Sequence, residues 1–208
     1  MIQIEHTSTS GWETALRGMR NPLQSWEKSD SYFPEGTPII GQKDLNLMLR
    51  LAKGGSEHRK YLRYIHIGMD ALAPDYFWKQ FSTYKVGVTE NSTSTMHKLH
   101  SRPLDITDFS CEHLTGDSLK EFEQMLRTIN NLRASYIESK DKNTWYAMIQ
   151  LLPMGYNFRR TLDFNYETAL NMILQRHNHK LYEWHGFCNY LMSLPYMTDL
   201  YSAIYEEL

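Results

Sequence analysis

The segment APDYFWKQFSTYKVGVTENSTSTMH, residues 73–97, decides how the rest of the chain is interpreted, because an aromatic run leads directly into a dense polar run. Pro74 lacks an amide hydrogen and Asp75 carries a negative charge, and both are tolerated where a helix begins. The aromatic residues that follow give this helix a buried side, and the pattern predicts that it ends near Tyr84.

The polar run after this helix is a candidate binding site. Gly87 breaks the helical pattern, and the next short hydrogen-bonding side chains are Thr89, Asn91, Ser92, Thr93, Ser94 and Thr95. Each of these side chains can donate or accept close to the backbone, which suits a polar ligand. A solvated Ser/Thr loop explains the same composition. Other parts of the chain must therefore decide between the two interpretations.

The composition predicts one domain covering residues 1–208. A chain of 208 residues with 41% hydrophobic content can bury a core. A formal net charge of −2 argues against binding a nucleic acid polymer or an anionic membrane by bulk electrostatics, and it leaves room for a local basic pocket. No apolar run reaches membrane length, and the first ten residues lack the features of a signal peptide. We expect a cytoplasmic protein.

Cysteine and histidine spacing predicts no metal site and no disulfide framework. Cys111 and Cys188 are too few for such a framework, so buried reduced thiols are expected. His177 and His179 form a His-x-His pair without a suitably spaced acidic partner, which is a weak metal signal.

Periodicity predicts helices and strands on both sides of the central segment. Ser10 with Glu13, and Ser118 with Glu121, match the capping box that starts a helix. The expected strands are 2–6 and 63–69, a loop is expected over 24–38, and the expected helices begin at 10 and at 118, cover 45–51, and end before Pro153.

The central segment resembles the signature of the flavin-dependent thymidylate synthases, R-H-R-x-x-S-x-N-E-x-S-x-R-Y after a helix ending in Q-W-x. Aligned from the shared Ala-Pro, the Gln falls on Gln80 and the Arg-His-Arg falls on Thr83, Tyr84 and Lys85. After one additional residue in the turn, the two Ser, the Asn and the Glu fall on Thr89, Ser94, Asn91 and Ser92.

Two further segments resemble the same family in the same order. His58 precedes Ala73 by fifteen residues, which is the spacing of the first His in the family's H-x-x-x-x-E-H segment, but the later Glu-His is missing. If Glu57 and His58 are read as that Glu-His pair, Ala52 replaces the first His. Half of the segment is missing in either alignment.

The strongest match lies near the C-terminus. After a Leu-Pro pair, Asn165, Asn171 and Arg176 keep the family's Asn-Asn-Arg spacing. On an ideal helix Asn165 and Arg176 lie within about 20° of each other, whereas Asn171 lies about 120° from Asn165. The first and third residues are therefore expected to face one pocket, and Asn171 to reach it from another side.

The resemblance implies an α+β fold, with a small mixed or antiparallel sheet flanked by helices, and a homotetramer with sites between subunits. It implies flavin- and folate-dependent methylation of a deoxyuridine nucleotide, dUMP to dTMP, or a close variant on another pyrimidine nucleotide such as hydroxymethylation. FAD would be the cofactor, with methylenetetrahydrofolate and NADPH as co-substrates. The alternative is a non-catalytic nucleotide-binding protein on the same fold.

The roles of individual residues follow from the resemblance alone. Arg176 would be the catalytic cation beside the pyrimidine and a substrate ligand. The flavin would be held by His58, Thr83, Tyr84, Lys85, Asn165 and Asn171. The nucleotide would be held by Gln80, Asn91, Ser92 and Ser94. His58, Ser94 and Arg176 are expected to line a common cavity, within one subunit or across neighbouring ones.

The chain departs from the family where phosphate should bind. Met96 and Ile149 stand at positions where the family has arginines. A phosphate dianion needs cationic or hydrogen-bonding replacements. Candidates nearby in sequence are Lys98, Arg102, Arg159 and Arg160.

Overall fold

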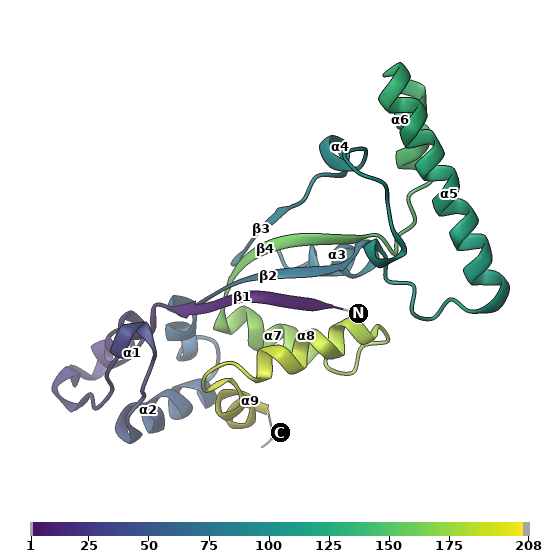
Figure 1. Ribbon diagram of the computed structural model, residues 1–208. Coiled ribbons are helices and arrows are strands. Elements are labelled where there is room, and N and C mark those ends of the chain that lie inside the picture. The colour runs from purple at the N-terminus through teal and green to yellow at the C-terminus, as the bar shows by residue number, and fades with distance from the viewer. Residues whose placement is uncertain (1, 206–208) are drawn as a thin grey trace. The chain divides into compact units, whose positions relative to one another are not determined.

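The computed structural model describes residues 2–205 and contains a sheet together with helices (Figure 1). The sheet has four strands in the order β1-β2-β4-β3. The strands are β1 (Gln3–Ser10), β2 (His66–Pro74), β3 (Val88–Ser92) and β4 (Asn157–Asn165). The α-helices are α1 (Trp12–Arg20), α2 (Gln42–Lys53), α3 (Asp75–Phe81), α4 (Thr95–Lys98), α5 (Gly116–Ser139), α6 (Lys142–Gln150), α7 (Tyr166–Arg176), α8 (Tyr182–Met192) and α9 (Met197–Tyr205). The expected α+β class is confirmed.

Internal contacts divide the described chain into two compact units. The first unit comprises residues 2–3, 71–83 and 91–160, and the second comprises 4–70, 84–90 and 161–205. The expectation of a single domain stays a prediction. Each unit is described by itself below.

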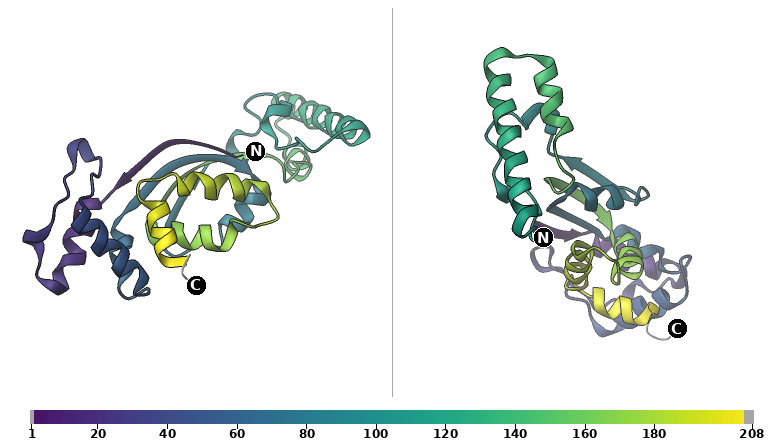
Figure 2. Two further views of the ribbon diagram at one scale, coloured as in Figure 1. Left: turned by 90° about the horizontal axis from the view of Figure 1, so that it is seen from below. Right: turned by 90° about the vertical axis from the view of Figure 1, so that its right-hand side faces the viewer.

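The core of the second unit joins strand residues to the C-terminal helices. Alternate residues of a strand face one side of a sheet, and here Ile67, Met69, Leu162 and Phe164 are each at most 2% exposed. The ring of Phe164 lies 6.3 Å from that of Phe187 in α8. Figure 2 shows α7, α8 and α9 next to one another in yellow-green and yellow. This packing fixes α7, on which several candidate site residues lie.

Helix α1 of the second unit forms as predicted but starts differently. Its buried face includes Trp12, Leu16 and Met19. The capping box at Ser10 is wrong, because Ser10 belongs to β1 and the N-cap is Gly11 with φ of +82°. A Cβ at Gly11 would lie only 1.9 Å from the carbonyl oxygen of Tyr64. Close backbone approach therefore requires glycine here.

The segment between α1 and α2 is anchored on the fully buried carboxylate of Asp44. Its Oδ1 accepts from Arg20 Nε at 2.6 Å. Its Oδ2 accepts from the hydroxyls of Ser29 and Ser31, both at 2.7 Å, and from the amides of Asp30 and Ser31. Burial raises the pKa of Asp44, but the hydrogen bonds outweigh burial and hold the pKa below its ordinary value. The segment expected to be a loop is thus held by a buried ion pair.

In the first unit, α3 forms where the central segment predicts it. Phe77, Trp78 and Phe81 are fully buried. The indole Nε1 of Trp78 donates to the carbonyls of Ala73 at 2.8 Å and Phe158 at 3.1 Å. The helix ends at Phe81, earlier than expected.

The first unit has its own hydrophobic cluster, formed by Leu99, Leu104, Phe109, Ile129 and Met148. Helices α5 and α6 supply two of these residues and pack side by side (Figure 1). The predicted capping box at Ser118 and Glu121 is wrong. Instead, Thr115 is the N-cap and Ser118 is its partner, so α5 begins at Gly116.

The strand predictions are correct only in part. Residues 3–6 of the expected strand lie in β1, but β2 begins at His66 because residues 59–64 form a 3₁₀ helix. The segment 88–92 is β3 and not loop, and β4 was not predicted at all. None of the helices within residues 2–205 combines the length and apolarity needed to cross a membrane.

Candidate functional site

The segment from Tyr84 to Gly87 in the second unit runs alongside α7. At one end, the hydroxyl of Tyr84 donates to Gln175 Oε1 at 2.9 Å, in the last turn of α7. At the other end, a Cβ added to Gly87 would lie 2.9 Å from Asn165 Nδ2 and 3.3 Å from Thr168 Oγ1. The segment therefore runs antiparallel to the helix, from its last turn to its first. Gly87 has φ of +72°, which favours glycine at this close approach.

Asn165 precedes α7 as its N-cap. Its backbone is extended, with φ of −101° and ψ of 167°. Its Oδ1 accepts from the amide of Thr168 at 2.9 Å and from the Thr168 hydroxyl at 3.1 Å. The side-chain nitrogen of Asn165 faces Gly87. The expected angle between Asn165 and Asn171 is wrong, because a capping residue does not follow the helical rotation.

Asn171 shares a helix face with two residues that contact the Tyr84 to Gly87 segment. Residues three and seven apart lie on one face of an α-helix. Thr168, Asn171 and Gln175 have this spacing, and Asn171 is partly buried. The structure thus brings Asn171 to the face of α7 along which Tyr84 and Lys85 lie. The side chain of Lys85 is exposed.

Arg176 at the end of α7 is held between two aromatic rings. Its Cζ lies 5.6 Å from the ring centroid of Tyr84 and 5.1 Å from that of Trp184. Its Nε donates to the Tyr84 hydroxyl at 3.0 Å. Stacking on aromatic faces keeps a guanidinium oriented while its terminal nitrogens can still donate. The arrangement presents a permanent, oriented cation.

The charge of Arg176 affects the pKa values of two nearby groups, His179 and Cys188. Burial lowers the pKa of His179, and repulsion by Arg176 adds to that lowering. Burial raises the pKa of the Cys188 thiol to about 12, against an opposing effect of Arg176. Cys188 is therefore a protonated, buried thiol at neutral pH, and it is no candidate nucleophile.

His58 is exposed, and its neighbour connects it to the start of α7. Arg59 Nε lies 3.0 Å from Glu167 Oε1, and Glu167 belongs to the first turn of α7. The segment with His58 therefore lies at the helix end where Asn165 is the cap. His66 begins β2 and is a satisfied sheet residue, because its Nδ1 lies 2.9 Å from Asp163 Oδ1.

The other predicted site residues belong to the first unit. The hydroxyl of Thr83 donates to the Gln80 carbonyl at 2.8 Å and so closes the end of α3. Asn91 and Ser92 end β3 with exposed side chains. Ser94 is the N-cap of α4, and its Oγ accepts from the amide of His97 at 3.2 Å.

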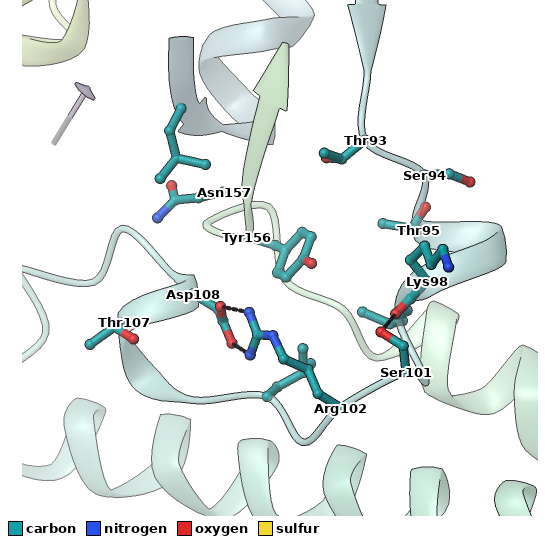
Figure 3. A pocket seen from close by; sticks show the side chains of 13 residues that line it. Thr93, Ser94, Thr95, Lys98, Ser101, Arg102, Thr107, Asp108, Tyr156 and Asn157 are labelled. Atoms are coloured by element: carbon teal, nitrogen blue, oxygen red, sulfur yellow. Dashed lines mark hydrogen bonds and ion pairs between the residues drawn. The ribbon is translucent and has the colours of Figure 1, made fainter. Parts of the chain in front are cut away.

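A cavity of about 320 Å³ in the first unit includes Ser94 in its wall. Figure 3 shows its lining, with the hydroxyl residues 93–95 and Lys98 on one side and Arg102, Asp108 and Tyr156 on the other. Gln80, Asn91 and Ser92 are not among the lining residues. Of the expected nucleotide ligands in this unit, Ser94 lines the cavity.

Arg102 and Asp108 form an ion pair in the wall of this cavity. Both terminal nitrogens of Arg102 donate to the carboxylate, Nη1 to Oδ2 at 2.8 Å and Nη2 to Oδ1. Burial raises the pKa of Asp108, but hydrogen bonds led by that from Arg102 hold it below its ordinary value. The charge of Arg102 is thus balanced within the wall.

Two contributors to these sites were missed in the sequence. Neither Trp184 nor Tyr156 is among the predicted site residues. Trp184 holds Arg176 from another helix, and nothing in the spacing of the two residues indicates it. Among residues 2–205 the structure has no group of three or more His, Cys, Asp or Glu side chains that could hold a metal ion.

The fold is that of the flavin-dependent thymidylate synthases, because solved structures of this class align with nearly the whole chain. The crystal structure of flavin-dependent thymidylate synthase ThyX from Helicobacter pylori, complexed with FAD and dUMP, aligns with 99% of this chain and 98% of its own, with a TM-score of 0.67 and 19% identity. A second structure of that enzyme with FAD and dUMP aligns with 96% of this chain and 95% of its own, with the same TM-score and identity. The sequence matches no protein-family model and no curated protein. The resemblance is confirmed at the level of the fold.

Proposed function

We propose that this chain is a flavin-dependent thymidylate synthase-like enzyme that methylates dUMP, or acts in a closely related way on another pyrimidine nucleotide. The observation that carries the proposal is the face of α7, along which two distant parts of the chain meet. Tyr84 and Lys85 come from one part, and Asn165, Asn171 and Arg176 come from the other. The solved structures with this fold contain FAD and dUMP, which supports the proposal.

The residues along α7 fit a flavin by their chemistry. His58, Tyr84, Lys85, Asn165 and Asn171 are neutral or cationic donors, and none of them is a carboxylate. Such a set suits the diphosphate of FAD and the polar edge of its ring. We assign these residues and Thr83 to the cofactor. Bound FAD would supply the hydride chemistry, with NADPH as its reductant and methylenetetrahydrofolate as the carbon donor.

Arg176 is the proposed catalytic residue and a ligand of the pyrimidine. A permanent cation beside the base favours the ionised form of a ring nitrogen. Tyr84 and Trp184 hold the guanidinium in one orientation, so the charge does not have to be repositioned when the base ionises. No enzyme nucleophile is required. Gln80, Asn91, Ser92 and Ser94 remain the proposed nucleotide ligands, and a cytoplasmic homotetramer remains the proposed assembly.

A non-catalytic nucleotide-binding protein on the same fold is the second candidate. The specific observation in its favour is the loss of two family arginines. Met96 is 49% exposed, and Ile149 packs against the hydrophobic cluster of the first unit. Neither side chain can donate to a phosphate.

The colour of bound flavin and the conversion of dUMP distinguish the two candidate functions. The purified protein is expected to bind FAD, to lose flavin absorbance when NADPH is added, and to change the mass of dUMP when methylenetetrahydrofolate is present. Arg176→Ala should abolish this change, whereas Arg127→Ala on exposed α5 should not. A colourless protein that binds dUMP without converting it would support the binder and overturn the enzyme.

A further inference from the structure

Two adjoining pockets of the second unit lie along β1, and the function proposed above uses neither of them. The larger pocket has a volume of about 530 Å³ and is lined by residues of β1, of the loop that contains Glu35, and of the end of α8 with the turn that follows it. The smaller pocket, of about 310 Å³, is lined by the end of β1, the start of α1 and Phe33. Thr9 lines both pockets, and both volumes fall within the range of small-molecule sites.

The two pockets are separate from the candidate flavin site. Strands β1 and β3 form the two edges of the sheet. The pockets lie along β1, whereas the Tyr84 to Gly87 segment leads directly into β3. None of the residues assigned above to the flavin or to the nucleotide lines either pocket. A ligand bound here is therefore an additional ligand, and the inference does not rest on the proposed function.

Charge excludes anions from both pockets. Among the described residues that line them, the charged side chains are Glu35 in the larger pocket and Glu13 in the smaller one, and none is Lys, Arg or His. A carboxylate repels a phosphate or another carboxylate, and no cation in these walls compensates the repulsion. A ligand of these pockets is therefore neutral or positively charged.

Hydrogen bonds within the wall of the larger pocket determine what its hydroxyls can offer a ligand. The Oγ1 of Thr7 accepts from the Tyr190 hydroxyl at 2.7 Å, and the Oγ1 of Thr9 accepts from Trp12 Nε1 at 3.0 Å. Each threonine therefore keeps its own proton for a ligand. The hydroxyl of Ser193 donates to the Tyr190 carbonyl at 2.6 Å, so its oxygen can only accept. The wall thus presents donors and acceptors together.

A ligand for this wall must both donate and accept hydrogen bonds. An ammonium group only donates, so the threonine protons would find no acceptor on it. The hydroxyl groups of a sugar donate and accept, and two adjacent ones can donate to the two oxygens of Glu35. Pro38, Leu194 and Pro195 add an apolar part to the wall, which suits the CH groups of a sugar ring.

The smaller pocket repeats the chemistry of the larger one. Glu13 is its carboxylate, and Ser10 and Thr14 add hydroxyls to the hydroxyl of Thr9. The half-buried ring of Phe33 supplies an apolar surface. Because the two pockets share Thr9, two linked rings can occupy them together.

We propose that these pockets bind a neutral disaccharide, with one ring in each pocket. Glu35 accepts from adjacent hydroxyls of the first ring, and Thr7 and Thr9 donate to its oxygens. Glu13 accepts from the second ring. A monosaccharide therefore occupies the larger pocket alone.

The test measures the binding of uncharged sugars to the full chain by saturation-transfer NMR. D-glucose and N-acetyl-D-glucosamine probe the larger pocket, and their dimers cellobiose and chitobiose probe both pockets. Glu35→Gln should weaken the binding of monomers and dimers about tenfold, which is the effect of losing a charge-assisted hydrogen bond. Glu13→Gln should weaken the binding of the dimers only. Glu27→Gln is the matched control, because Glu27 is an exposed carboxylate between α1 and α2 that lines neither pocket.

A second variant tests the larger pocket without changing its charge. Ser193→Ala removes one acceptor and should weaken the binding of all these sugars about two- to fivefold. The proposal is overturned if none of the sugars binds at millimolar concentration, or if Glu35→Gln leaves their binding unchanged. Binding of putrescine that depends on Glu35, without binding of any sugar, would overturn the sugar assignment and identify an amine site. Thermal denaturation of each variant checks that the substitutions leave the fold intact.

Discussion

Replacing Asp44 by Asn should destabilise the protein more than any other single polar substitution considered for the second unit. Asp44 is 0% exposed, and its partner Arg20 is 4% exposed, so water cannot compensate a lost charge. Oδ1 faces the Arg20 guanidinium, and Oδ2 faces two hydroxyls and two backbone amides. Whichever way the new amide points, its NH₂ group meets donors. The buried guanidinium is also left without a counterion.

The expected loss is about 3–5 kcal/mol of unfolding free energy, the usual cost of removing one partner of a buried ion pair. That is a large part of the roughly 5–15 kcal/mol that stabilises a typical protein. For a chain of this size, it lowers Tm by roughly 10 °C. The double variant Arg20→Met with Asp44→Leu should recover only part of this loss, because neither charge then has to be buried but the two hydroxyls and two amides around Oδ2 lose their acceptor.

Urea denaturation, monitored by tryptophan fluorescence, measures the unfolding free energy of both variants. The pH dependence of this free energy tests whether the ion pair is the cause of the loss. The folded pKa of Asp44 lies below its ordinary value of 3.8. Its contribution is therefore complete above the unfolded pKa and is lost as the pH falls below about 3.8 through the folded pKa. Asp44→Asn should lack this acid-dependent component. The role of the ion pair would be refuted if Asp44→Asn lowered the unfolding free energy by less than about 1 kcal/mol and left its decrease at acidic pH unchanged.

Three further predictions concern the candidate site along α7. Lys85→Ala should lower the FAD content of the purified protein, measured by absorbance per chain, and undiminished content would count against the cofactor assignment. Gly87→Ala forces a Cβ to within 2.9 Å of the N-cap side chain at a φ of +72°, so it should cost about 1–2 kcal/mol and lower FAD content as well; full stability in thermal denaturation would contradict this. Tyr84→Phe keeps the ring but removes the oxygen that accepts from Arg176, so kcat should fall about tenfold with a smaller change in KM, and an unchanged kcat would show that the hydroxyl does not orient the cation.

Helices were predictable from the sequence where one face is apolar, and their ends were not. The aromatic run of α3 gave its position, because Phe77, Trp78 and Phe81 are large aromatic residues with helical spacing and all three are fully buried. The capping boxes failed because a Ser followed by Glu three residues later also occurs beside other structures. Ser10 is part of a strand, and Ser118 is the partner of another cap.

Strand β4 was missed because a charged residue interrupts its alternation. Phe158, Leu162 and Phe164 have the spacing of one strand face, but Arg160 occupies the place between them. The structure explains the exception, because the Arg160 guanidinium stacks 4.6 Å from the ring centroid of Trp78. A partner so distant in sequence cannot be inferred from local periodicity.

The Asn-Asn-Arg spacing led to the right helix with the wrong geometry, and the reason explains how the site is assembled. A helix phase cannot be extended to Asn165, because this residue is the extended N-cap. With Thr168 as the first reference, Asn171 falls on the face that the Tyr84 to Gly87 segment follows. The hydroxyl of Tyr84 reaches the last turn of α7, while Gly87 contacts the first. Two motifs that are far apart in sequence therefore share one helix face, and the missing side chain of Gly87 allows its close approach to Asn165.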